Sequence, residues 1–165
     1  MTISQGAQAN KNGRVFEKMM IPIFEDAGFK VFTESELQKE ASKNGLESLS
    51  KYVIKNAKYQ TIYNEGGKTE FVIVAADRRI RVEAKYQASP GSVDEKYPYM
   101  LLNGIYKYPE NEIIFVVDGD GYKPGARQWL ADSIRDNWLH YKELGKDIKL
   151  MSIAEFLNWF NHEFT

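Results

Sequence analysis

The stretch Glu70–Gln87, which reads EFVIVAADRRIRVEAKYQ, contains two apolar segments rich in β-branched residues. The first segment is Glu70–Ala75 and the second is Ile80–Gln87, with a polar turn around Asp77 and Arg78 between them. Two runs of this kind separated by a short turn predict a β-hairpin. We therefore expect these two strands to lie side by side and antiparallel.

The second segment carries three polar side chains at alternate positions, Glu83, Lys85 and Gln87. Side chains on a strand alternate between its two faces, so these three share one face. A turn of two or four residues would pair Glu70 with Lys85 and add Glu70 to that face, whereas an odd turn without a bulge would not. Burying an acid, a base and an amide together is costly, which favours a functional reason for the cluster.

Two carboxylates on one face repel each other unless a cation lies between them. Oxygen ligands of this kind suit Mg²⁺ or Mn²⁺, which keep several waters and bind substrate phosphates. A lysine beside such a site can orient water or stabilise charge on a phosphate. The pattern also fits a ladder of salt bridges on an exposed strand, because Glu-x-Lys is a common tripeptide.

The composition fits one globular domain over residues 1–165, since 43% of the 165 residues are apolar. The chain has no cysteine, which excludes disulfides and thiolate metal sites. It has no apolar run long enough to span a membrane, so no membrane partner is expected. Its formal net charge of −1 provides no global basic field, so any binding to nucleic acid must come from local basic patches.

The remaining elements follow from periodicity and turn residues. A helix over 14–27, a short extended piece at 30–32 and a helical insert at about 33–58 precede the hairpin, and this insert includes a second helix over 46–56. A strand is expected near 59–63, with a turn at 65–68. After the hairpin we expect a helix over 93–103 capped by Ser92, a strand over 112–117 parallel to the one before it, a helix over 126–135 with Trp129 inward, a strand over 148–151 and a final helix capped by Ser152.

The order of these elements, together with three motifs, resembles the PD-(D/E)XK nuclease superfamily. Glu70 on one strand and Glu83-Ala84-Lys85 on the next correspond to the acid and the D/E-x-K motif of that family. The run KYQ followed by GSVDEKYPY, and the strand end IIFVVDGDGY, are similar to phage and bacterial members. The resemblance covers about residues 14–135. One departure is that Thr69-Glu70 replaces the usual Pro-Asp.

The resemblance implies a mixed α/β fold with a restriction-endonuclease-like αβββαβ core, in which helices flank a central mixed sheet. It implies a Mg²⁺-dependent DNA endonuclease of restriction, homing or junction type, with Mn²⁺ as a possible substitute. Glu70, Glu83 and the Ala84 carbonyl would bind the metal. Lys85 would orient or activate water, and Gln87 would position Lys85, the water or a phosphate.

Glu17, beside the apolar stripe of the first helix, is a further candidate for this site or a solvated residue. Basic and polar side chains near the motif would bind DNA or would simply be solvated: Arg78, Arg79, Arg81, Ser92, Lys96 and Lys123. A homodimer is expected for cutting both strands. The expected compartment is the cytoplasm of a bacterial or phage-infected cell. A non-catalytic DNA-binding or partner-binding module on the same fold and an RNA-processing nuclease remain open alternatives.

Overall fold

The computed structural model describes residues 5–91 and 94–165, with side chains described from residue 14 onward. One six-stranded sheet forms its centre, in the order β1-β2-β3-β4-β5-β6. The strands are β1 (Lys30–Phe32), β2 (Lys51–Gln60), β3 (Gly66–Ala75), β4 (Arg78–Tyr86), β5 (Glu112–Asp118) and β6 (Asp147–Met151). The helices are α1 (Gln5–Asp26), α2 (Glu34–Asn44), α3 (Lys96–Tyr106), α4 (Pro124–Arg135) and α5 (Ile153–Phe164), with 3₁₀ segments at Leu46–Ser48 and Trp138–Leu144.

The sheet is mixed. Strands β2, β3 and β4 form an antiparallel meander, whereas β1 runs parallel to β2, and β5 and β6 continue parallel to β4. Helix α3 connects β4 to β5, as the sequence predicted for a βαβ unit. The predicted mixed α/β class with a central mixed sheet is therefore confirmed.

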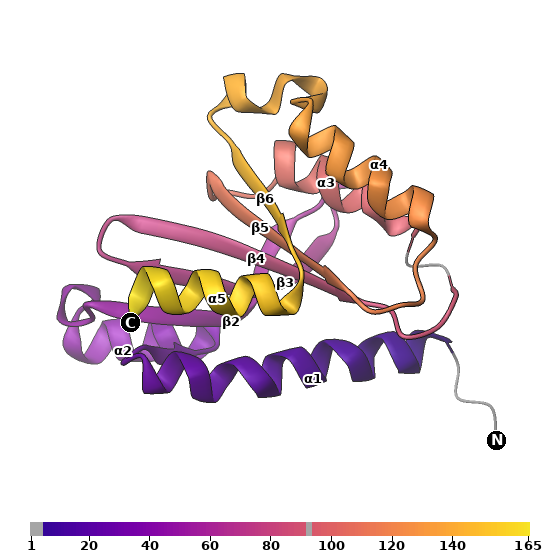
Figure 1. Cartoon of the computed structure of the whole chain (residues 1–165). Coiled ribbons are helices and arrows are strands. Elements are labelled where there is room, and N and C mark those ends of the chain that lie inside the picture. The colour runs from indigo at the N-terminus through magenta and orange to yellow at the C-terminus, as the bar shows by residue number, and fades with distance from the viewer. Residues whose placement is uncertain (1–4, 92–93) are drawn as a thin grey trace.

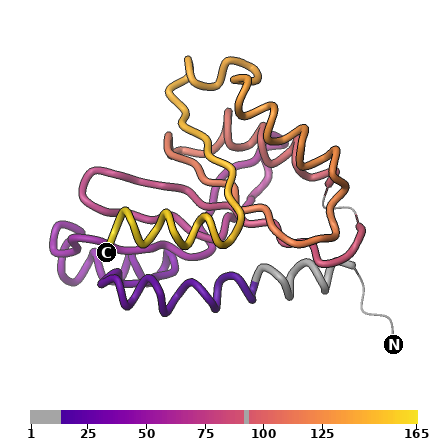
Figure 2. The backbone as a smooth tube through the Cα atoms, viewed as in Figure 1, coloured from indigo at the N-terminus to yellow at the C-terminus, as the bar shows by residue number. Residues whose placement is uncertain are grey.

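Helices cover both faces of the sheet (Figure 1). On one face, α1 and α5 lie side by side, and both views show them running along the same side of the strands (Figure 2). Phe24 of α1 packs edge-on against Phe71 of β3 and Phe160 of α5, at centroid distances of 5.0 and 5.1 Å. On the other face, α3 and α4 cover β5 and β6. The core is thus two apolar layers with the sheet between them.

The second half of the predicted helical insert is wrong. Thr33 caps α2 through a capping box with Glu36, but the helix predicted over 46–56 is a short 3₁₀ turn followed by β2. Tyr52, Val53 and Ile54 are all buried, because β2 is covered on both faces. A short continuous apolar run cannot be assigned to a strand or a helix by periodicity alone. The next predicted turn is displaced as well, since β2 ends at Gln60 and the two glycines begin β3.

The pairing of β3 with β4 is shifted by two residues relative to the predicted register. The turn is Ala76-Asp77 and Val72 pairs with Arg81, so the register does not place Glu70 opposite Lys85 as predicted. The predicted even length of the turn is correct, so the polar faces of the two strands still coincide. Two smaller corrections concern helices. Helix α3 begins at Lys96, with Ser92 outside the described residues, and Trp129 is 36% exposed rather than inward.

Candidate active site

The regular pairing of β3 with β4 ends at Phe71 and Val82. Just beyond this point the side chain of Glu70 replaces a backbone partner, because its Oε2 accepts a hydrogen bond of 2.6 Å from the Ala84 amide. On the neighbouring strand Asn56 has a φ of 52°, and it interrupts the pairing of β2 with β3 between Lys55–Phe71 and Ala57–Thr69. The sheet is therefore locally irregular where Glu70 meets β4.

Glu83 lies opposite Phe115 of the neighbouring strand β5, and Phe115 packs in the apolar layer beneath α3. The Glu83 side chain is almost fully buried and forms an ion pair with Lys85 through Oε1. The other oxygen, Oε2, is buried and has no hydrogen-bond partner in the described part of the chain. Lys85 Nζ also lies 3.3 Å from the Ala84 carbonyl oxygen. One strand end thus holds two carboxylates, one ammonium and one carbonyl.

The charged groups of this cluster shift one another's pKa values. Burial and the neighbouring Glu83 carboxylate raise the pKa of Glu70 to about 7, against the opposing effect of Lys85. Burial alone would lower the pKa of Lys85, but the carboxylates of Glu83 and Glu70 outweigh it and raise that pKa. At neutral pH Lys85 is therefore an ammonium, and Glu70 carries a charge that its surroundings tolerate poorly without a further cation.

We predict that this raised pKa makes the metal-free protein less stable as the pH rises toward 7. The unfolded chain ionises Glu70 near 4.5, whereas the folded chain keeps its proton up to about 7. Between these values the folded state binds more protons, so its free energy of unfolding falls with rising pH and levels off above 7. Urea unfolding in EDTA across this range should show the fall in the wild type and a smaller fall in Glu70→Gln.

The control for this experiment is Glu25→Gln, at an exposed position on α1. It should follow the wild-type curve. If the curves of Glu70→Gln and the wild type stayed parallel from pH 5 to 8, the raised pKa of Glu70 would be refuted.

Gln87 joins the end of β4 to β5 and the loop that follows it. Its backbone amide donates to the Asp118 carbonyl at 3.0 Å, and its carbonyl accepts from the Gly121 amide at 2.8 Å. Its side-chain Nε2 donates to the Gly121 carbonyl at 3.0 Å. Asp118 in turn accepts from the amides of Gly119 and of Ile153, the first residue of α5. The glutamine therefore fastens the loop after β5 to the strand that carries Lys85.

This close packing requires glycine at position 119. Gly119 has a φ of 100°, and a Cβ there would lie 2.2 Å from the Gln87 carbonyl oxygen. We predict that Gly119→Ala lowers the free energy of unfolding by about 2 kcal/mol or more, because left-handed strain adds to a backbone clash. Gly125→Ala is the matched control, since a Cβ at Gly125 meets nothing within 4 Å. In helix α4 that change should stabilise by up to about 1 kcal/mol. Chemical denaturation measures both, and equal effects would contradict the prediction.

Comparison with protein families shows to which family this chain belongs. The model of the PD-(D/E)XK nuclease superfamily domain matches residues 8–164. The chain belongs to the PD-(D/E)XK nuclease superfamily. Neither the curated proteins nor the solved structures gave a match. Membership confirms the resemblance seen in the motifs and indicates a nuclease.

The oxygen donors of this PD-(D/E)XK strand end fit a hard divalent cation. Glu70 and Glu83 supply carboxylates, one oxygen of Glu83 is buried without a partner among the described residues, and the Ala84 carbonyl directly follows Glu83 on β4. The described residues contain no group of three or more His, Asp or Glu side chains that could hold a metal. Glu17 is placed by α1 at 3.9 Å from Lys55, on the neighbouring β2. Two carboxylates with a carbonyl and waters suit Mg²⁺, which rarely uses an all-protein cage.

The basic residues predicted to bind DNA separate into two groups. Arg78 and Arg79 lie at the opposite end of β4 from Lys85, about 20 Å away at the usual rise per strand residue. Arg78 is held by Glu112 and Glu163. Arg81 is 3% exposed and bound to Glu110, so its predicted contact with DNA is wrong as the structure stands: a buried, paired guanidinium presents nothing to a phosphate.

Lys96 and Lys123, by contrast, are exposed where α3 and α4 begin. Both helices start after the carboxyl ends of β4 and β5, the strand ends that also carry Lys85 and Gln87. The two starts are tied together, because the Lys123 amide donates to the Asp94 carboxylate at 3.1 Å. Ser92 lies outside the described residues.

Sequence reasoning missed the tyrosines around the cluster. Tyr59 of β2 and Tyr108, just after α3, pack edge to face at 4.7 Å. Burial first and the Glu83 carboxylate second raise the pKa of both phenols. The Arg81 guanidinium lies over both rings, at 5.7 and 5.2 Å from their centroids. The only signal for them in the sequence was the count of ten tyrosines, which does not say where they meet.

Proposed function

We propose that this chain is a Mg²⁺-dependent DNA endonuclease, and that Glu70, Glu83 and Lys85 form its catalytic centre. The observation that carries the proposal is the strand end itself. There a buried carboxylate with one unpartnered oxygen lies beside a second carboxylate of raised pKa and a lysine. A purely structural ion pair would leave neither a free buried oxygen nor an acid that resists ionisation.

The metal would be held by Glu70, Glu83 and the Ala84 carbonyl. When bound, Mg²⁺ or Mn²⁺ would offset charge on a phosphate oxygen and lower the pKa of a coordinated water. The carboxylates keep Lys85 protonated, so its proposed role is to donate a hydrogen bond. As an ammonium it orients the attacking water or stabilises charge on the phosphate, rather than removing a proton.

Gln87 is proposed as a positioning residue. Its side-chain Nε2 donates to Gly121, while its Oε1 is buried without a partner among the described residues, so its proposed action is to fix the strand end on which Lys85 stands. Glu17, which faces Lys55 in the structure, is proposed to reach the site only by giving up that partner. DNA is proposed to approach over the starts of α3 and α4, where Lys96 and Lys123 are exposed. A homodimer would bring two such centres to opposite strands.

Incubation with plasmid, linear duplex, branched DNA and single-stranded RNA, each with Mg²⁺ and with EDTA, tests this proposal. We expect Mg²⁺-dependent internal cuts in at least one DNA substrate and none in EDTA. Cuts in RNA alone would support the RNA-processing alternative. Binding to DNA without cuts under either condition would refute the endonuclease and support a non-catalytic module.

No helix among residues 5–91 and 94–165 is long and apolar enough to cross a membrane.

A further inference from the structure

The turn between β2 and β3 holds an exposed tyrosine in a fixed position. Tyr63 is 69% exposed, and its ring stacks on Tyr99 of α3 with centroids 5.2 Å apart and planes inclined by 27°. One face of the ring is thus covered by Tyr99, while most of the side chain remains open to solvent. An exposed aromatic ring that is held in this way can stack on another flat ring.

The turn that carries Tyr63 is tightly hydrogen-bonded. The Thr61 hydroxyl accepts from the amides of Tyr63 and Glu65, each at 3.3 Å, and the Thr61 amide donates to the Glu65 carbonyl at 2.9 Å. The Ile62 amide donates to Asn103 Oδ1 at 2.9 Å, and this fully buried asparagine also binds the Tyr99 carbonyl. The Asn103 side chain therefore ties the backbone of the turn to the backbone of α3 at Tyr99, so the platform is pre-formed.

The platform adjoins the candidate active site. Tyr59 links the two, because it stands on β2 just before the turn that carries Tyr63 and packs edge to face against Tyr108 at 4.7 Å. An open groove of about 790 Å³ runs along the same turn and is lined by Tyr59, Lys58 and Lys68. On α3, Lys96 stands one helical turn before Tyr99 and is exposed on the same side. Lys58 and Lys68 on the groove and Lys96 on α3 are exposed, Tyr59 is half-buried, and Glu34 and Glu65 also line the groove.

We propose that Tyr63, supported by Tyr99, stacks against an unpaired base of the nucleic acid that this site processes. The inference rests on the proposed nuclease function and specifies its substrate as one with unpaired nucleotides, such as a gap, a branch or a single strand. A base inside a continuous duplex offers its ring faces only to its neighbours, whereas an unpaired base is free to stack on a tyrosine. Lys58, Lys68 and Lys96 would lie along the phosphates.

The test is binding of labelled oligonucleotides by fluorescence anisotropy, with Ca²⁺ in place of Mg²⁺. The probes are a blunt DNA duplex, the same duplex with a short single-stranded gap, and the single strand as DNA and as RNA. Tyr63→Ala should weaken binding of the gapped and single-stranded probes about 5- to 100-fold and leave the blunt duplex unchanged. Tyr63→Phe should bind like the wild type, because stacking needs the ring and not the hydroxyl.

Tyr106→Ala is the matched control, since Tyr106 is a tyrosine of α3 that is 52% exposed. The inference is overturned if Tyr63→Ala binds the gapped probe like the wild type, if it loses the blunt duplex to the same extent, or if Tyr106→Ala shows the same loss. Cleavage separates this inference from the proposed function. If the protein needs Tyr63 to bind unpaired bases but never cuts, only the proposed nuclease function is refuted. If it cuts equally well without Tyr63, only the stacking platform is refuted.

Discussion

Lys85→Ala is expected to lower Mg²⁺-dependent DNA cleavage by about 100- to 1,000-fold. Losing one group that stabilises developing charge has an effect of this size. Lys85 is the one cation that directly pairs with Glu83 and touches the Ala84 carbonyl, so no neighbouring residue on β4 replaces it. Lys85→Arg should recover little, because a planar fork does not fit a position built for a compact ammonium.

Glu83→Ala should lower cleavage at least as far, because it removes the buried carboxylate that would bind the metal. It should also change Glu70 in a way that needs no enzyme assay. The Glu83 charge raises the pKa of Glu70, so its removal should bring the pKa of Glu70 back toward its ordinary value. Carbon-detected NMR of the side-chain carboxyl measures this shift.

The control for both variants is Lys149→Ala, because Lys149 forms an ion pair with Asp147 at 3.1 Å in the edge strand β6. It should cleave like the wild type. Undiminished cleavage by Lys85→Ala or Glu83→Ala would remove these residues from the catalytic centre. Circular dichroism and thermal unfolding establish whether a loss of activity reflects chemistry or folding.

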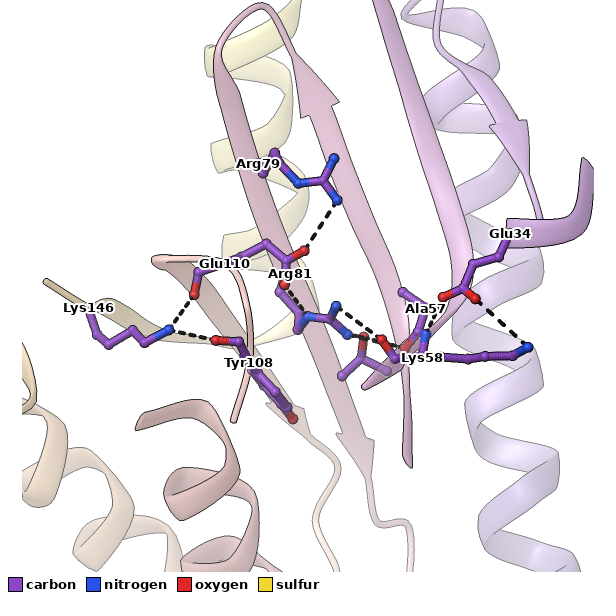
Figure 3. A network of polar contacts seen from close by, with 9 residues as sticks. Glu34, Ala57, Lys58, Arg79, Arg81, Tyr108, Glu110 and Lys146 are labelled. Carbon is purple, nitrogen blue, oxygen red and sulfur yellow. Dashed lines mark hydrogen bonds and ion pairs between the residues drawn. The ribbon is translucent and has the colours of Figure 1, made fainter. Parts of the chain in front are cut away.

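The second large effect is expected from Arg81→Ala, which should lower the free energy of unfolding by about 3–5 kcal/mol. Arg81 is buried in the middle of the sheet and binds Glu110, the Thr69 hydroxyl at 2.9 Å and the Ala57 carbonyl at 3.2 Å. Glu110 is 2% exposed at its side chain, so truncating Arg81 leaves a carboxylate in the interior without its main partner. Figure 3 shows this network, with Lys146 binding the Glu110 and Tyr108 carbonyls from the opposite side.

Two further variants separate this mechanism from a simple loss of packing. Replacing both partners with apolar residues, as in Arg81→Met with Glu110→Leu, should restore most of the lost stability, because no buried charge is then unpaired. Arg135→Ala removes an arginine that is 66% exposed in its ion pairs with Asp132 and Asp136, and it should change stability by less than about 1 kcal/mol. Urea unfolding measures all three.

A loss below about 1 kcal/mol for Arg81→Ala would contradict the buried-pair interpretation. The pH dependence supplies a separate check. Burial alone would raise the pKa of Glu110, but the hydrogen bond and charge of Arg81 lower it below the usual range. This contribution to stability is present above the ordinary pKa of a glutamate and is lost as the pH falls through the lowered value. Arg81→Ala should therefore flatten the acid limb of the stability curve.

Elements with a strong local signature were predictable. The final helix begins at Ile153 after the predicted cap Ser152, which forms a capping box with Glu155, and its buried Phe156 and Phe160 follow helical spacing. The parallel pairing of β4 with β5 was also predictable, because two apolar strands joined by a helix of this length form a βαβ unit. In each case the information lies within one short segment or one connection.

Strand β2 was not predictable in the same way. Its centre is buried on both faces, so it lacks the alternation that identifies a strand, and the residues before it are compatible with a helix. The register of the hairpin failed for a related reason. Ala76 adopts a φ of 52° in the turn, and nothing in its residue type predicts that conformation. The turn therefore forms one residue earlier than the polar residues suggest.

By itself, the sequence determined that Glu83 and Lys85 share one face of one strand, because side-chain alternation is a property of the local backbone. The sequence also showed that Glu70 reaches the same region only if the turn has an even length or a bulge, and the two-residue turn Ala76-Asp77 meets that condition. Only the tertiary structure decided that Glu70 binds the Ala84 amide, that Arg81 is buried in a structural ion pair, and that Tyr59 and Tyr108 lie beside Glu83. These contacts join segments distant in the chain, and packing between layers, not periodicity within a segment, fixes them.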